Sequence, residues 1–237
     1  ARLDFAGAAD MSRDIEPDWR SPNFNSREGA PIDMLILHYT GMKTCEEALE
    51  RLCDPQAEVS AHYLIDEDGT VHRLVDEAER AWHAGVASWR GETNVNSRSI
   101  GIELVNPGHE WGYRDFPARQ MQALVPLCQE IIGRHGIPAR NVVGHSDVAP
   151  TRKLDPGEKF DWAMLARAGI GLWPDTDNLP APCENYEVLK LLVEVGYDVT
   201  NEPAAIAAFQ RHFRPRRFDG NADEETRRTL AAVHALI

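Results

Sequence analysis

The sequence predicts an α/β fold, with a central β-sheet flanked by helices, followed by a small three-helix C-terminal domain. Two observations carry this prediction. Short apolar runs typical of buried strands alternate with segments of helical periodicity over the first 170 or so residues, and beyond them the periodicity is helical only. The chain has 237 residues, of which 43% are hydrophobic, enough for one α/β domain and a small second unit.

Three apolar runs predict inner strands, and each brings a polar side chain with it. Residues 33–39 (DMLILHY) are too compact for a typical helix, and His38 lies near their end. Residues 99–105 (SIGIELV) carry a lone charge, Glu103, where a carboxylate needs a specific reason to be present. A third, shorter run leads directly into His145.

A helix and a hairpin are expected between the first two of these strands. Thr44 and Glu47 have the spacing of a capping box, which opens a helix that ends near Cys53. Residues 60–65 and 71–75 predict two strands joined by a glycine-containing turn. Together with the inner strands, this hairpin predicts a mixed sheet.

Two further helices are expected later in the chain. One runs from Pro117 to about Arg134, with Pro126 inside it, which should bend or break the helix by removing a hydrogen bond. The other covers about residues 161–168.

A proline-rich segment, residues 174–183, predicts a linker between two units. The larger unit spans residues 1–173 and includes an N-terminal extension over residues 1–29. In residues 184–237, apolar side chains recur at helical spacing in three stretches, so three short helices can close a small core.

Composition excludes several classes of partner. The chain has 25 basic and 38 acidic residues, a net charge of −13, which argues against nucleic acid because phosphate binding relies on clustered lysine and arginine. There is no apolar run of about 18 residues, so no membrane span is expected. The four cysteines lack a Cys-x-x-Cys spacing and are expected to be buried thiols: Cys45, Cys53, Cys128 and Cys183.

His38, His145 and Asp155 predict a catalytic metal site. Two imidazoles at strand ends and one carboxylate in a following loop can converge on one ion, and they leave the fourth position of tetrahedral Zn²⁺ open to water. Hydrolysis is therefore the leading hypothesis. On spacing alone, ordinary hydrogen-bonded histidines remain an alternative, and this is the interpretation adopted for His109, His135, His212 and His234.

A serine hydrolase is the competing interpretation of residues 144–148 (GHSDV). The strained nucleophile turn of such enzymes requires glycine at its fifth position, and this chain has Val148 there. The serine interpretation therefore fails.

Five motifs resemble those of the type 2 zinc N-acetylmuramoyl-L-alanine amidases, in the order of that family and over roughly residues 30–173. The motifs are LHYTG (37–41), SAHYLID (60–66), AWHAG (81–85), SIGIELVN (99–106) and GHSDVAPTRKLDPG (144–157). The tail is similar to a three-helix peptidoglycan-binding module, and within this AmiD/AmpD-like family the motifs and the tail together indicate the AmiD branch and not the single-domain relatives. The resemblance implies cleavage of the amide between N-acetylmuramic acid, or its 1,6-anhydro form, and L-alanine in peptidoglycan or muropeptides.

The resemblance also implies roles for individual residues. The Zn²⁺ ligands would be His38, His145 and Asp155, with Glu103 as the proton acceptor and Lys153 beside the oxyanion. Substrate contacts are expected at Tyr63, Trp82 and His83, for which core packing is the alternative, and at Asn106.

The rival function is a non-catalytic peptidoglycan-recognition protein on the same scaffold. Such proteins lack the third metal ligand, whereas Asp155 is present here, which favours the enzyme. A monomer is expected. The wall-binding tail favours the periplasm or cell envelope, and a cytoplasmic recycling enzyme is the alternative location.

Overall fold

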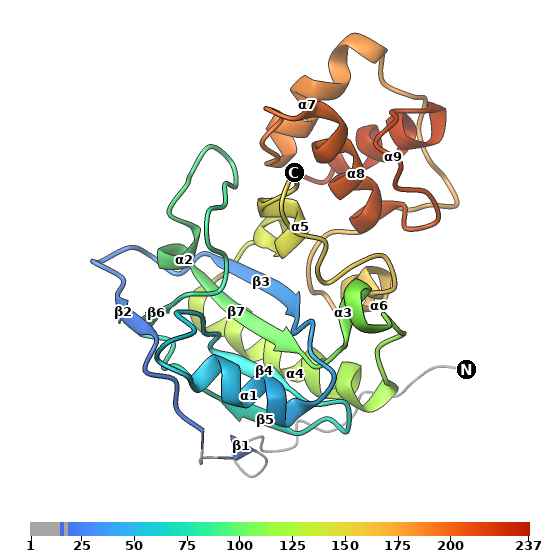
Figure 1. Ribbon diagram of the computed structural model, residues 1–237. Coiled ribbons are helices and arrows are strands. Elements are labelled where there is room, and N and C mark those ends of the chain that lie inside the picture. The colour runs from blue at the N-terminus through green and yellow to red at the C-terminus, as the bar shows by residue number, and fades with distance from the viewer. Residues whose placement is uncertain (1–14, 17–18) are drawn as a thin grey trace.

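The computed structural model describes residues 15–16 and 19–237, and its centre is a mixed six-stranded sheet in the order β1-β5-β4-β7-β3-β8 (Figure 1). Strand β4 pairs with β5 in the antiparallel direction, which is the predicted hairpin, and the other neighbours are parallel. A separate two-stranded sheet joins β2 to β6. The strands are β1 (Ile15–Glu16), β2 (Phe24–Ser26), β3 (Met34–Tyr39), β4 (Tyr63–Ile65), β5 (Val71–Arg73), β6 (Glu79–Ala81), β7 (Ser99–Leu104) and β8 (Val142–Gly144).

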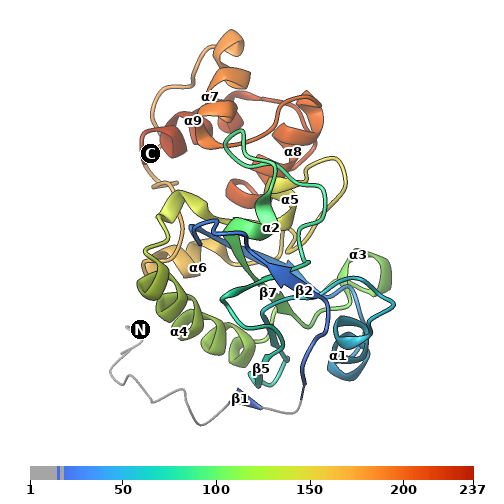
Figure 2. The same cartoon turned by 90° about the vertical axis from the view of Figure 1, so that its left-hand side faces the viewer.

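Helices cover both faces of this sheet, as Figure 2 shows for α4 on one side and α1 on the other. The face under α4 is built from alternate strand residues such as Leu35, Ile100 and Ile102, which pack against Leu124 and Ile131. The predicted α/β fold with a mixed central sheet is confirmed. The helices are α1 (Cys45–Cys53), α2 (Val95–Arg98), α3 (Gly108–Trp111), α4 (Ala118–His135), α5 (His145–Val148), α6 (Trp162–Arg167), α7 (Val188–Val195), α8 (Glu202–Phe213) and α9 (Glu224–His234).

Helix boundaries follow the expected signals with two differences. The Thr44 hydroxyl accepts from the Glu47 backbone N–H at 3.2 Å, but the Glu47 carboxylate accepts from the N–H of Lys43 instead of completing the box on Thr44. Helix α4 continues through Pro126, so the proline does not end it. About two turns of helix on each side, packed on the sheet, keep the helix together despite the lost hydrogen bond.

The predicted extension over residues 1–29 lies partly outside the described residues, and its described part supplies β1 and β2. All four cysteines are free thiols. The prediction of burial holds for Cys128 and Cys183, while Cys45 and Cys53 are half-buried. Within residues 15–16 and 19–237, no helix combines the length and hydrophobicity that crossing a bilayer requires.

The three helices expected in residues 184–237 are present as α7, α8 and α9, and they lie together beyond α5 (Figure 1, orange to red). They share one apolar core with the larger unit. That core joins Met34, Ile36, Trp89, Val143 and Val148 to a second group from the C-terminal helices, namely Val188, Leu192, Ile206, Phe209, Phe213, Leu230 and Val233. The C-terminal helices are therefore packed on the sheet domain.

Candidate active site

The three predicted metal ligands meet at the carboxyl edge of the parallel part of the sheet. His38 lies near the end of β3, and His145 begins α5 directly after the neighbouring strand β8, where Gly144 pairs with Leu37. Carboxyl ends of adjacent parallel strands open onto the same edge of a sheet, which is where α/β proteins place their ligands. Asp155 reaches this point from the loop after α5.

The atoms that would bind an ion are close enough to share one. The Nδ1 atoms of His38 and His145 lie 2.9 Å apart, and each lies 3.0 Å from Oδ2 of Asp155. Tetrahedral zinc with nitrogen and oxygen ligands at about 2.0–2.2 Å brings those ligand atoms to about 3.3 Å from one another. All three side chains are buried, so the spacing fits one small cation held at the sheet edge.

The hydrogen bonds behind both imidazole rings leave their Nδ1 lone pairs free for such an ion. His145 donates from Nε2 to the carbonyl oxygen of Ala84 at 2.9 Å, since a carbonyl can only accept. His38 has its Nε2 atom 3.0 Å from Nδ1 of His83. Protein metal sites use partners of this kind to orient the ligand rings.

A chain of hydrogen bonds fixes which way the proton between His38 and His83 points. The Ser99 hydroxyl donates to the carbonyl of Val95 at 2.7 Å, so its oxygen accepts from Nε2 of His83 at 3.1 Å. The Nδ1 atom of His83 must then accept from Nε2 of His38. The donor set therefore matches a zinc ion bound through two neutral imidazoles and a carboxylate.

The protonation states favour the same interpretation. Burial and, to a lesser extent, the neighbouring His145 lower the pKa of His38 to about 4, against the opposing effect of Asp155. Burial alone would raise the pKa of Asp155, but His145 and His38 outweigh it and hold that pKa well below its usual range. Neutral imidazole and ionised carboxylate are the forms that bind metals.

Glu103 lies beside the ligands because it is the register partner of His38 in the parallel pair β3 and β7. Its Oε2 atom is buried and has no hydrogen-bond partner among the described residues. Burial, and to a lesser extent the nearby Asp155, raise the pKa of Glu103 to about 8, against the opposing effect of Lys153. A divalent cation close by would also oppose the rise, because it favours the charged carboxylate.

Glu103, His145 and Asp155 line a pocket of about 430 Å³. Lys153 and Trp82 lie on its wall, and the Trp82 indole N–H donates to Oδ1 of Asn25 at 2.9 Å. His83 also borders the pocket but is only 8% exposed, with both ring nitrogens bonded as described above. Its expected substrate contact stays a prediction, while its described contacts support His38.

Two predicted substrate contacts are corrected by the structure. Tyr63 pairs with Ile102 and not with Glu103, so its side chain lies on the α4 face, where its hydroxyl donates to Glu77 at 2.7 Å. The same carboxylate accepts from Arg134 and His135 of α4.

Asn106 is the second correction. Its side chain is fully buried, donates to the carbonyl of Arg114 and accepts from the N–H of Gly108. It braces the loop between β7 and α4 and does not line the pocket.

Some lining residues were missed by the sequence reasoning. Tyr39 and His109 both border the pocket, with the Tyr39 hydroxyl 2.9 Å from Nδ1 of His109, and Nε2 of His109 3.0 Å from Glu158. Arg152 also borders it and donates to the carbonyl of Ala84. Only their place in the sequence could have indicated two of these residues, since Tyr39 follows His38 and Arg152 precedes Lys153.

Comparisons with known proteins identify the family that this chain resembles. The family model described as N-acetylmuramoyl-L-alanine amidase matches residues 28–158. The N-acetylmuramoyl-L-alanine amidase AmiD of Escherichia coli K12 is 40% identical over 229 residues, covering 85% of this chain and 82% of that protein. The 1,6-anhydro-N-acetylmuramyl-L-alanine amidase AmpD of Enterobacter cloacae is 46% identical over 107 residues, covering 45% of this chain and 55% of that protein.

Solved structures of amidases are also similar to this chain. AmiD from E. coli, in complex with the substrate anhydro-N-acetylmuramic acid-L-Ala-D-γ-Glu-L-Lys, superposes with a TM-score of 0.78 at 37% identity, over 90% of this chain and 98% of that one. AmpDh3 from Pseudomonas aeruginosa gives a TM-score of 0.77 at 31% identity, over 100% and 98%. By sequence and by structure, the chain belongs to the N-acetylmuramoyl-L-alanine amidase family.

Proposed function

We propose that this chain is a zinc-dependent amidase that cleaves the bond between N-acetylmuramic acid, or its 1,6-anhydro form, and L-alanine in peptidoglycan or muropeptides. The observation that carries the proposal is the convergence of His38, His145 and Asp155, with both Nδ1 lone pairs directed at one point beside a pocket. The E. coli relative solved with an anhydromuropeptide supports this class of substrate.

A zinc ion held by these three side chains would polarise the amide carbonyl and lower the pKa of a nearby water toward about 7. The protein supplies the remaining groups. Glu103 is the proposed general base and acid: its unpaired Oε2 atom is free to take a proton from water and later deliver it to the leaving amine of L-alanine.

Lys153 is proposed to stabilise the oxygen that becomes negative during attack on the amide. Its ammonium group is close enough to Glu103 to lower that residue's pKa, and it lines the same pocket. Because the charge on the oxygen develops only during the reaction, this contact favours the transition state over the substrate. Trp82 offers an apolar face to a sugar ring or peptide on the pocket wall.

The proposed domain organisation is a catalytic unit over residues 1–173, a linker over residues 174–183 and a peptidoglycan-binding unit over residues 184–237. Similarity of the tail to three-helix wall-binding modules supports the last assignment. We place the enzyme in the cell envelope, because the intact polymer that such a unit binds lies there. We propose that it acts as a monomer.

Mass spectrometry of purified muropeptides incubated with the protein, with and without a chelator, tests the reaction, the bond and the metal together. We expect free L-alanyl peptide and the matching sugar, and no product after chelation. A protein that binds muropeptide and releases no product would be the recognition protein instead.

The role of Glu103 is tested separately with Glu103→Ala and the isosteric Glu103→Gln. Both variants should keep zinc and lose about 10²–10⁴-fold in turnover, because proton transfer is removed while the ligands remain. Full activity in either variant would overturn the assigned role.

A further inference from the structure

Asp147 is a buried carboxylate that joins the proposed metal site to the C-terminal helices. It is the third residue of α5, two positions after His145, and only 1% of it is exposed. Its Oδ2 atom accepts from the N–H of Gly144 and from Nδ1 of His212, both at 2.7 Å, and its Oδ1 atom accepts from the hydroxyl of Tyr197 at 2.7 Å. Two of its three donors therefore come from residues 184–237.

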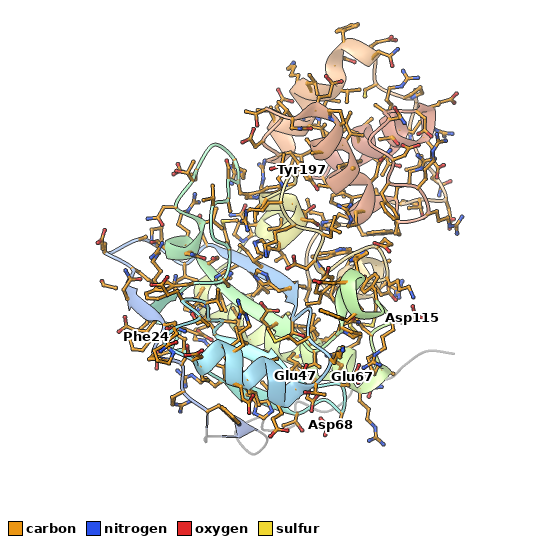
Figure 3. The ribbon with its side chains drawn as sticks, viewed as in Figure 1. Phe24, Glu47, Glu67, Asp68, Asp115 and Tyr197 are labelled. Carbon is orange, nitrogen blue, oxygen red and sulfur yellow. The ribbon has the colours of Figure 1, made fainter. Side chains whose placement is uncertain are left out.

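Both of these donors are held firmly. The Tyr197 ring is 2% exposed and meets the Trp89 ring edge to face, with the centroids 5.1 Å apart. The neighbouring carbonyl of Gly196 accepts from the N–H of Arg90 at 2.8 Å. Figure 3 shows Tyr197 at the junction between α5 and the C-terminal helices.

The second donor is fixed by stacking. The His212 ring lies between the rings of Trp162 and Phe213, with centroid distances of 3.8 and 4.0 Å and nearly parallel planes. Trp162 belongs to the larger unit, so the aromatic stack crosses from one unit to the other. Neither donor can turn away from Asp147 without breaking packed contacts.

Helix α5 depends on such support because it is one turn long and gains little stability of its own. His145 is its first residue. The N–H of Ser146 donates to the backbone carbonyl of Asp155 at 2.8 Å, so the position of α5 also sets the backbone of a second proposed ligand. Holding Asp147 in place therefore also holds the two proposed metal ligands, His145 and Asp155, in their positions.

We propose that Tyr197 and His212 are positioning residues for the amidase site: by holding Asp147 they orient α5, and with it His145. The inference rests on the proposed zinc function. On this proposal, residues 184–237 help to build the catalytic centre. If they only tethered the enzyme to the wall, removing their contacts with α5 would leave the metal site intact.

The test uses the full chain with Tyr197→Phe, His212→Phe and the double variant. Phenylalanine keeps the packing and the stacked ring and removes only the hydrogen-bond donor. We expect the double variant to bind zinc about 10–100-fold more weakly in competition with a fluorescent chelator, the range seen when supports of metal ligands are lost. With soluble muropeptide, kcat should fall while KM changes less than about twofold, because the pocket wall is untouched.

Two further variants separate positioning from general stability. His212→Asn returns a side-chain N–H near the place of Nδ1 and should recover part of the lost zinc affinity. Val233→Ala removes a fully buried side chain from the same shared core, at a place away from α5. It should lower the melting temperature without changing zinc affinity.

Wild-type zinc affinity in the double variant would overturn the inference, as would an equal loss of affinity in Val233→Ala. A wild-type protein that binds no zinc would overturn the proposed function, and the inference with it.

Discussion

Replacing Gly101 with alanine should weaken the metal site through a residue that does not bind metal. Gly101 lies on β7 directly under the His83 ring, and a Cβ atom added there would lie 2.5 Å from Cγ of His83. An ordinary contact needs at least 3.4 Å, so the ring must move by about 0.9 Å. Such a shift lengthens the 3.0 Å hydrogen bond from His38 to His83 beyond hydrogen-bond range.

The size of the effect follows from this displacement. Overpacking in a filled interior costs about 1–3 kcal/mol, and 2 kcal/mol lowers the melting temperature of a chain this long by about 4–8 °C. Loss of the partner behind a ligand histidine costs about 10–100-fold in metal affinity. Zinc should therefore bind Gly101→Ala more weakly by about 1.4–2.8 kcal/mol.

Zinc titration against a competing chelator and thermal unfolding of the zinc-free protein measure the two effects separately. Gly133→Ala is the matched control: Gly133 lies in α4 with open space around its Cβ position, and alanine there should leave zinc affinity unchanged and stabilise the helix by up to about 1 kcal/mol. If Gly101→Ala bound zinc as tightly as the wild type, His83 would not be the support of His38 inferred from its contacts.

Three more changes have distinct expected results. Asp155→Ala should abolish both zinc binding and turnover, as measured by metal analysis and muropeptide cleavage, and zinc retained at one equivalent would contradict its role as ligand. Lys153→Ala should keep zinc and lower kcat about 10²–10³-fold, the usual loss of one oxyanion-stabilising group, so an unchanged kcat would remove it from the mechanism. Burial raises the pKa of Glu77, but hydrogen bonds from Arg134 and its neighbours outweigh it and lower the pKa to about 2. Since the folded pKa is depressed, the ionised carboxylate stabilises the protein above about pH 4.5, and this stabilisation is lost as the pH falls toward 2. Glu77→Gln should lower the free energy of unfolding by about 1–2 kcal/mol at pH 7, after allowance for screening around the half-exposed Arg134. In unfolding measurements at pH 3, the difference from wild type should be smaller.

The sequence predicts the parts of the site that depend on local signals. His38 and His145 follow short apolar runs, and such runs form strands whose ends meet at one edge of a parallel sheet. Glu103 is conspicuous as a single charge among apolar residues, and the register of β7 against β3 brings it beside His38. These residues could be recognised because each signal lies within a few residues of the side chain.

The errors concern facts that no short segment encodes. Tyr63 was expected near the substrate, but its orientation depends on the pairing of a three-residue strand, in which Leu64 and not Tyr63 is the partner of Glu103. The role of His83 depends on which of its ring nitrogens faces His38.

The packing of the C-terminal helices was likewise not predictable. An apolar helical face shows that a residue such as Phe209 will be buried, but not whether its neighbours come from the same unit or from another. Periodicity was satisfied equally by an independent three-helix core and by the shared core that the structure contains.

The shared core also bears on how the protein is made. A chain is synthesised from its N-terminal end, and all the side chains of the proposed catalytic centre precede residue 156 in the sequence. Yet α5 gains two of its supports only when Tyr197 and His212 have been synthesised and have docked against Asp147. On the positioning role proposed above, the chain therefore holds all of the proposed catalytic side chains before it can arrange them, and hydrolysis begins only after the C-terminal helices have packed against α5.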